Sequence, residues 1–185
     1  YKHSPTALNA PDALQHLVVM SAASKTFDIA GLRTGYVIIP DAALRDRFAV
    51  LYAAMDIQPN RMGADLTCAA YTPEGATWVD ALMQVLDGNR QALTDGLNVI
   101  PGVSVMPMQS TFLAWVDFSG TGLSDAEIRT RLYDVARVLP SPGDDLGTGG
   151  ALHHRFNIGA PRAMIDAAIV RIQGAFDDLQ YLAAE

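Results

Sequence analysis

Residues 24–35 read SKTFDIAGLRTG, a stretch that places a lysine eight residues before an arginine with a glycine two positions to either side. It follows the apolar run HLVVM at residues 16–20 and precedes the run GYVII at residues 35–39, both typical of strands buried on both faces. In open α/β sheets, ligands bind beyond the carboxyl ends of the strands. Lys25 and Arg33 are therefore candidates for one ligand site in the loop between two strands.

The two cations offer different chemistry. A lysine amine attacks an aldehyde when desolvation leaves it partly deprotonated, whereas the planar guanidinium of an arginine matches a phosphate dianion. Gly31 and Gly35 let the backbone approach a ligand closely, and Ser24 adds a hydroxyl donor beside Lys25. Taken alone, Lys25 would be a solvated surface charge and Arg33 half of a surface ion pair. Together they indicate a ligand that has both an aldehyde and a phosphate, which describes pyridoxal 5'-phosphate.

A lysine followed by glycine, arginine and glycine at the sixth, eighth and tenth positions resembles the cofactor-lysine signature of class I and II aminotransferases, the fold-type I pyridoxal-phosphate enzymes. The resemblance implies that Lys25 is the catalytic residue, which bonds covalently to the cofactor and later moves the proton at the substrate Cα. It implies that Arg33 holds the cofactor phosphate. It also implies an α/β fold: the C-terminal portion of the aspartate-aminotransferase-like fold, with the end of the large-domain sheet and a small α+β domain.

Other stretches resemble one branch of that family, the cystathionine β-lyase-like (C–S lyase) enzymes. These stretches are Trp78 with residues 88–90 (GNR), residues 101–102 (PG), residues 111–117 (TFLAWVD) and residues 155–162 (RFNIGAPR). With the lysine signature, the resemblance extends over essentially the whole chain.

Arg155 lies in a run that alternates like a strand, and a partly buried arginine needs an anion. The resemblance implies that this anion is the α-carboxylate of the substrate, while the alternative from the residues alone is a structural ion pair. His153 and His154 precede Arg155, but neighbouring residues on a strand face opposite ways and cannot form a metal pair with each other. No spacing in the chain is typical of a zinc site, so no metal is expected.

The sequence departs from the family pattern near the lysine. The family often has a serine three positions before it, where this chain has Ala22, and Ser21 one residue further back is the alternative phosphate ligand. Arg137 and Leu146 stand where the branch usually has glycine and phenylalanine. We therefore expect a modified loop on the substrate side.

Periodicity predicts the remaining organisation. Helical stripes are expected at residues 44–55, 79–97, 128–135 and 165–179, and strands at residues 103–106, 112–116, 138–139 and 155–159. The character of the chain changes at Pro101-Gly102. We place residues 1–100 in the C-terminal part of the large cofactor-binding domain with its connecting helices, and residues 101–185 in the small C-terminal domain.

Composition limits the partners. The 185 residues carry a formal net charge of −7 with no basic run, which argues against nucleic acid as a partner. No apolar run approaches the roughly 18 residues that a membrane span needs. We expect a small-molecule amino acid as substrate and a cytoplasmic location, and the family resemblance implies a homodimer of the full-length protein.

The chain opens with Tyr1-Lys2-His3, and we expect the natural protein to begin well upstream. The resemblance implies that several cofactor contacts, including an aspartate that pairs with the pyridine nitrogen, come from an N-terminal half. These 185 residues alone are then expected to be inactive.

For the full-length protein, the resemblance favours β-elimination from cystathionine-like substrates, which gives pyruvate, ammonia and a thiol. The alternative is transfer of the amino group to a 2-oxo acid, which uses the same residues. A third reading is the cofactor-sensing domain of a transcription regulator, which would need a DNA-binding helix-turn-helix upstream.

Overall fold

The computed structural model describes residues 9–179. The chain packs into two units, one up to Ala81 and one from Leu82 onward, and each is described by itself. Helix α4 (Pro73–Leu97) contributes to both units. The division at residue 100 concerns the domains of the complete fold and stays a prediction. Among the helices of residues 9–179, none combines the length and the apolar character that crossing a bilayer requires.

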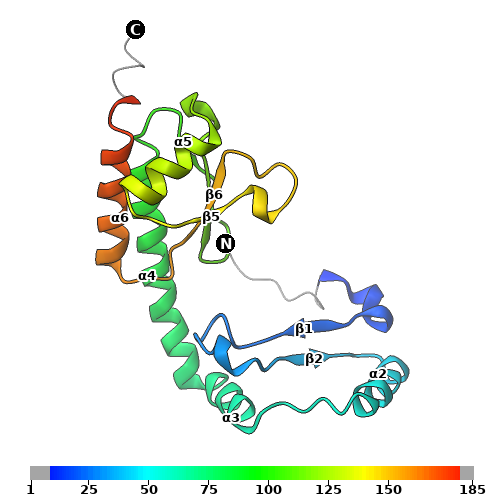
Figure 1. The fold of residues 1–185 in the computed structure, drawn as a ribbon. Coiled ribbons are helices and arrows are strands. Elements are labelled where there is room, and N and C mark those ends of the chain that lie inside the picture. Colours follow the sequence, from blue (N-terminus) through cyan, green and yellow to red (C-terminus); the bar gives the residue numbers. More distant parts are fainter. Residues whose placement is uncertain (1–8, 180–185) are drawn as a thin grey trace. The chain divides into compact units, whose positions relative to one another are not determined.

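The first unit contains a short antiparallel ladder of β1 (Val19–Ser21) and β2 (Tyr36–Ile38), shown in Figure 1. Ser21, the last residue of β1, pairs with Tyr36, the first residue of β2. Residues 22–35 therefore form a loop whose two ends are joined by the ladder. The loop includes a 3₁₀ turn, η2 (Ala30–Leu32), and a second 3₁₀ segment, η1 (Pro11–His16), precedes β1.

The expected burial of these two strands is wrong for the described residues. Met20 is 76% exposed and Ile38 is 52% exposed. The segment η1 takes the first residue of the predicted strand, and the ladder has only two strands. A two-stranded ladder buries little apolar surface unless further elements cover its faces.

The next two helices begin at side-chain caps. Helix α2 (Ala42–Ala54) follows Asp41, whose Oδ1 accepts a hydrogen bond from the Leu44 backbone N–H at 2.7 Å, as expected for a residue before a helical stripe. Helix α3 (Arg61–Ala70) follows Asn60, whose Oδ1 accepts from the Gly63 N–H at 2.7 Å. The stripe on α2 forms but stays largely exposed, since Leu51 is 66% exposed.

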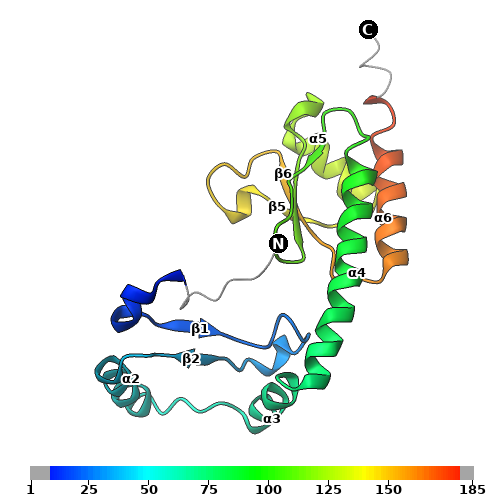
Figure 2. The ribbon, with the colours of Figure 1, turned by 180° about the vertical axis from the view of Figure 1, so that it is seen from behind.

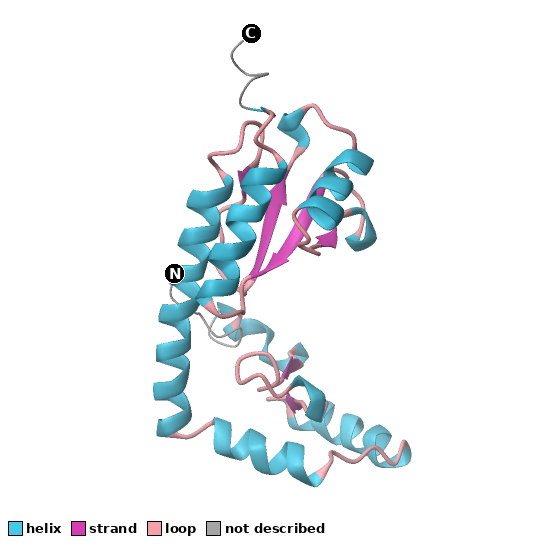
Figure 3. Ribbon diagram, turned by 60° about the vertical axis from the view of Figure 1, so that its left-hand side comes forward, coloured by secondary structure: helices cyan, strands magenta, loops and turns pink. Residues whose placement is uncertain are grey.

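The second unit has a four-stranded antiparallel sheet in the order β3-β4-β6-β5, covered on one face by helices (Figures 2 and 3). Its strands are β3 (Ser104–Val105), β4 (Leu113–Asp117), β5 (Ser141–Pro142) and β6 (His153–Asn157). Two 3₁₀ turns, η3 (Ser119–Thr121) and η5 (Asp144–Leu146), lie between them in the sequence. The strands expected at residues 103–106 and 112–116 form as β3 and β4, which pair in antiparallel orientation.

Helices α4 and α6 (Arg162–Ala175) lie side by side against this sheet in Figures 1 and 2. Gly96 allows the close approach, because a Cβ there would lie 2.4 Å from Cγ2 of Ile169. The Gln173 side chain donates to the Gly96 carbonyl at 2.8 Å across the same contact. The predicted stripe of α6 and the segment after it is confirmed. It comprises Ile165, Ile169, Ile172, Phe176 and Leu179, all of them buried.

Helix α5 (Asp125–Thr130) starts with the expected capping box of Ser124 and Glu127 and continues into a π-helical turn, η4 (Arg131–Val135). A π turn accommodates one more residue than an α turn, which rotates the following side chains. Ala136 is therefore buried after Leu132, whereas Val135, predicted to face the core, is 61% exposed.

The strand predicted at residues 138–139 is wrong. Leu139 is 81% exposed, and the paired residues are Ser141 and Pro142. Arg137 adopts a left-handed backbone with φ 53°, which redirects the chain before it reaches the sheet.

His154 is fully buried on β6, and neither of its ring nitrogens has a hydrogen-bond partner among residues 9–179. The ring packs edge-on against Phe118, with 5.7 Å between centroids, and against Tyr133 at 6.2 Å. Burial lowers the pKa of His154, and the surrounding charges of Asp125 and Arg129 act on it in opposite directions. The second unit therefore folds around a neutral imidazole.

We expect this imidazole to make the stability of the protein sensitive to mild acid. Because the unfolded chain takes up a proton near pH 6.5 and the folded state resists it, stability falls as pH drops below about 6.5. For one proton the slope approaches about 1.4 kcal/mol per pH unit. The carboxylates with lowered pKa values, Asp117, Glu127 and Asp178, act only at lower pH. Urea unfolding of the complete protein between neutral and mildly acidic pH measures the slope.

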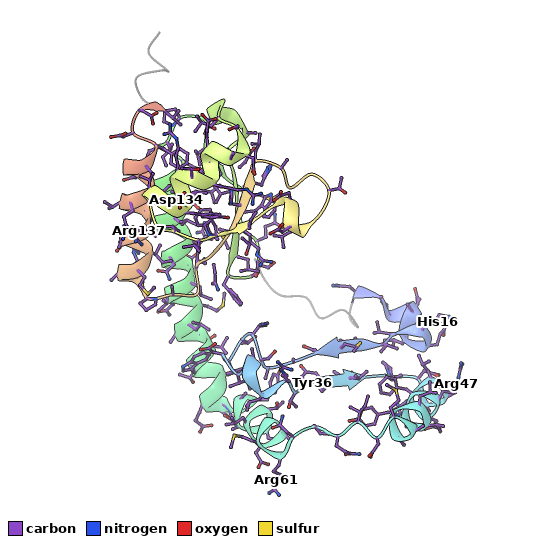
Figure 4. All side chains as sticks on the ribbon, viewed as in Figure 1. His16, Tyr36, Arg47, Arg61, Asp134 and Arg137 are labelled. Carbon is purple, nitrogen blue, oxygen red and sulfur yellow. The ribbon has the colours of Figure 1, made fainter. Side chains whose placement is uncertain are left out.

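The variant His154→Leu replaces the ring with an apolar side chain and should remove most of this slope. The control is His16→Gln, at an exposed histidine on η1 that is labelled in Figure 4. A slope that persists in His154→Leu would show that another group is responsible.

Candidate functional site

The loop that carries Lys25 is built on a buried turn. Ala23 is 1% exposed, and its carbonyl accepts from the Phe27 N–H at 3.0 Å. The Ser24 carbonyl accepts from the Ile29 N–H, also at 3.0 Å. This turn anchors the backbone around Lys25 and leaves its side chain exposed, with no hydrogen bond or ion pair to any residue from 9 to 179.

Arg33 lies near the other end of the same loop. Its backbone is left-handed, with φ 48° and ψ 41°, directly after the 3₁₀ turn η2. Its guanidinium is exposed and makes no hydrogen bond or ion pair within the described part of the chain. Gly35 lets the loop close, because a Cβ there would lie 3.1 Å from the Ser21 carbonyl oxygen. Lys25 and Arg33 thus lie on one closed loop, and neither side chain is paired with another residue from 9 to 179.

An aromatic cluster joins this loop to the junction of α3 and α4. The ring of Phe27 stacks on Trp78, with 5.6 Å between centroids, and packs edge-on against Tyr71 at 6.0 Å. The Tyr71 hydroxyl lies 3.0 Å from that of Tyr36. The pairing of these two tyrosines was not predictable from the sequence, because no motif connects residues this far apart in the chain.

Hydrogen bonds among the side-chain hydroxyl groups of Ser21, Tyr36 and Tyr71 shift the pKa values of the two tyrosines. Hydrogen bonds from the side chains of Ser21 and Tyr71 lower the pKa of Tyr36. The hydrogen bond to Tyr36, together with burial and the charge of an ionised Tyr36, raises the pKa of Tyr71 to about 12. Ser21, expected as a phosphate ligand, therefore belongs to a small hydroxyl network at the end of β1.

Arg155 belongs to the second unit, where it lies at the centre of β6. It pairs with Trp115 on β4 and with Ser141 on β5. It is half-buried, and its Nη2 donates to the Ser141 hydroxyl at 3.2 Å. No carboxylate among residues 9–179 pairs with this guanidinium, so the alternative of an internal ion pair finds no partner there.

His153 lies on the same sheet face as Arg155, whereas His154 points into the core, so the expected opposite orientation of the two histidines is confirmed. The His153 ring stacks on Trp115, with 5.5 Å between centroids, and its Nε2 lies 3.6 Å from Asp117 Oδ1. Burial raises the pKa of Asp117, but hydrogen bonds from Ser119 and the charge of His153 outweigh this and hold it below its usual value. Arg155 thus lies near an aromatic stack on a partly exposed face of the sheet.

Comparison with known proteins places these features in context. The chain matches the family model for aminotransferase class I and II over residues 3–172. It is 33% identical over 181 residues to the cystathionine beta-lyase PatB of Bacillus subtilis, which covers 95% of this chain and 46% of PatB. The chain spans about half the length of the curated relatives it matches.

Solved structures agree in fold. A PLP-bound putative aminotransferase from Clostridium difficile 630 has a TM-score of 0.87 and 31% identity, over 95% of this chain and 46% of that one. Cystalysin from Treponema denticola, whose structure contains a pyridoxal 5'-phosphate cofactor, has a TM-score of 0.86 and 25% identity, over 97% of this chain and 46% of that one. These likenesses confirm the fold class expected from the sequence.

The coupled tyrosines allow a direct test of the geometry around the loop. In Tyr36→Phe, Tyr71 loses both the hydrogen bond and the nearby negative charge, so its pKa should fall from about 12 toward its ordinary value of 10.0. A pH titration of the tyrosine ring-carbon NMR signals of the complete protein measures this change. Tyr52→Phe, at a tyrosine that stacks on Phe48 in α2, is the control and should leave Tyr71 unchanged. An unchanged Tyr71 in Tyr36→Phe would contradict the contact.

Proposed function

Because the chain belongs to the class I and II aminotransferase family, we propose that it supplies the covalent lysine and two anion-binding arginines of a pyridoxal-phosphate-dependent enzyme. The observation that carries this proposal is the loop of residues 22–35. It presents Lys25 and Arg33 without partners among residues 9–179 and is closed by a strand ladder. We propose C–S β-lyase activity on cystathionine-like substrates, with pyruvate, ammonia and a thiol as products.

The residues of the loop fit the cofactor by their chemistry. The amine of Lys25 suits the aldehyde, and the guanidinium of Arg33 suits the phosphate dianion. Ser21 and Ser24 are the proposed hydroxyl donors near the same groups. When bound, pyridoxal phosphate supplies an electron-withdrawing ring that stabilises negative charge at the substrate Cα.

The protein's own residues would then perform the remaining work. Lys25 would hold the cofactor through its amine, and once that amine is free it would take the proton from the substrate Cα. Arg155 binds the substrate carboxylate with its planar fork, and the hydroxyl of Ser141 holds that guanidinium from one side. The sulfur would leave Cβ as a thiolate and take up a proton to give the thiol, and water would hydrolyse the remaining three-carbon unit to pyruvate and ammonia.

Transamination is the second candidate, because it needs the same lysine and arginines. The likeness to a structure described as a putative aminotransferase favours it, whereas the likeness to PatB, described as a cystathionine beta-lyase, favours elimination. Fold alone does not separate the two reactions. We propose elimination because the likeness to PatB, at 33% identity, extends over 95% of the chain.

We further propose that residues 1–100 and 101–185 belong to the large and small domains of the complete enzyme, and that this enzyme is a cytoplasmic homodimer. Because the chain spans only about half of its relatives, the 185 residues by themselves are expected to show no turnover.

The first test incubates the complete protein and pyridoxal phosphate with L-cystathionine, without any 2-oxo acid, and measures pyruvate. We expect pyruvate from the natural sequence and none above background from Lys25→Ala, because no other group of the loop can bond to the aldehyde. Arg47→Ala, at an exposed arginine of α2 labelled in Figure 4, is the control and should retain activity. Cofactor binding without pyruvate would favour transamination or a non-catalytic sensor instead.

A second prediction concerns Arg155. Its replacement by lysine removes the bidentate fork, so KM for the amino acid should rise about 10- to 100-fold while cofactor affinity stays unchanged. The control is Arg162→Lys, at an exposed arginine that pairs with Asp166 at 2.7 Å. Steady-state kinetics and a cofactor titration measure both quantities. An unchanged KM would remove Arg155 from the carboxylate site.

A further inference from the structure

We propose that Asn60 is a positioning residue for Arg33: its side-chain amide holds the Leu32 carbonyl before that arginine and the Thr34 hydroxyl after it. The inference rests on the proposed function, in which Arg33 binds the cofactor phosphate. It is drawn from contacts within the first unit alone.

The amide of Asn60 uses both of its ends. Its oxygen accepts from the Gly63 N–H at 2.7 Å and caps helix α3. Its nitrogen donates to the Leu32 carbonyl at 2.5 Å and to the Thr34 hydroxyl oxygen at 3.2 Å. A capping asparagine needs only its oxygen, so the two donor contacts are additional to the cap and reach the residues on either side of Arg33.

Thr34 completes the network. Its hydroxyl accepts from Asn60 and donates to the Leu32 carbonyl at 3.0 Å. The Leu32 carbonyl before Arg33 and the Thr34 hydroxyl after it are thus tied to each other and to the start of α3.

These contacts bear on the backbone conformation of Arg33. A residue with a side chain is disfavoured in the left-handed region, and such a conformation persists only where surrounding contacts enforce it. Arg33 occupies that region with φ 48°. Its own backbone N–H donates to the Ala30 carbonyl at 3.1 Å within the turn, and the contacts of Asn60 connect this turn directly to the start of α3.

Gly63 provides an independent observation. It is buried in the first turn of α3, and a Cβ at this position would lie 1.9 Å from the Thr34 hydroxyl oxygen and 3.0 Å from Asn60 Nδ2. Only glycine therefore lets the helix start sit against the Arg33 turn. We call this arrangement of three residues the lock: the capping residue Asn60, the hydroxyl of Thr34 and the glycine Gly63.

Loss of the lock should weaken binding of the phosphate group and leave binding of the aldehyde group unchanged. Two probes separate these effects: pyridoxal 5'-phosphate, and pyridoxal, which has the aldehyde but no phosphate. The dissociation constant of pyridoxal divided by that of pyridoxal 5'-phosphate is the ratio that reports the phosphate contribution without any turnover. Both constants are measured on the complete protein by absorbance and by quenching of tryptophan fluorescence.

We expect Asn60→Ala to lower this ratio about tenfold, which corresponds to the loss of two hydrogen bonds. Arg33→Ala should lower it by at least as much. The double variant should be no worse than Arg33→Ala alone, because the lock acts through that side chain. Equal weakening of both probes, or losses that simply add, would overturn the inference.

Two further variants separate the lock from helix capping. Asp41→Ala removes the cap of α2, which has the same geometry but no contact with the loop, and should leave the ratio unchanged. Thr34→Val removes the hydroxyl and leaves the Asn60 cap intact, and should lower the ratio in the same direction as Asn60→Ala. A change in Asp41→Ala of the same size as in Asn60→Ala would reduce Asn60 to a helix cap and overturn its positioning role.

The experiment also separates this inference from the function on which it rests. An unchanged ratio in Arg33→Ala would overturn the phosphate role of Arg33 itself, and the inference with it. A lowered ratio in Arg33→Ala with an unchanged ratio in both Asn60→Ala and Thr34→Val would overturn the lock alone.

Discussion

The pairing of Ser21 with Tyr36 is the constraint on which the candidate cofactor site depends. It joins the two ends of residues 22–35, so that a lysine near the start of the loop and an arginine near its end are held by one frame. A loop closed in this way loses less conformational entropy when it binds a ligand than an open one would. Backbone groups of the loop form hydrogen bonds within its own turns. The side chains of Lys25 and Arg33 form no hydrogen bond or ion pair with other residues from 9 to 179.

In the second unit, Arg155 is positioned by a different kind of structure. Arg155 lies in the middle of a sheet, between two paired strands, so its position follows from strand register and needs no strained turn. One contact from Ser141 holds the guanidinium from one side. Membership of the class I and II aminotransferase family explains why one chain contains both arrangements, since the proposed substrate has an amine for the lysine side and a carboxylate for the arginine side.

The features of the fold and of the candidate site that depend on short-range sequence patterns were predictable. The lysine motif, the Asp41 cap, the capping box at Ser124 and the stripe of α6 are all short-range patterns, and the structure has each of them. The exposure of Val135 was not predictable, because the π turn before it depends on packing rather than on spacing. The role of Asn60 was also hidden, since its contacts cross 26 and 28 residues of sequence and a cap needs the same side chain.

Gly63 has a consequence for how genetic variation in this protein would be understood. Its position lies 30 residues beyond Arg33 in the sequence (63 minus 33) and has no side chain with which to bind anything. Because a methyl group there would collide with Thr34, a change to alanine would disturb the turn that contains Arg33 and so act on the candidate site from outside it. A survey confined to residues that touch the ligand would class the same change as harmless.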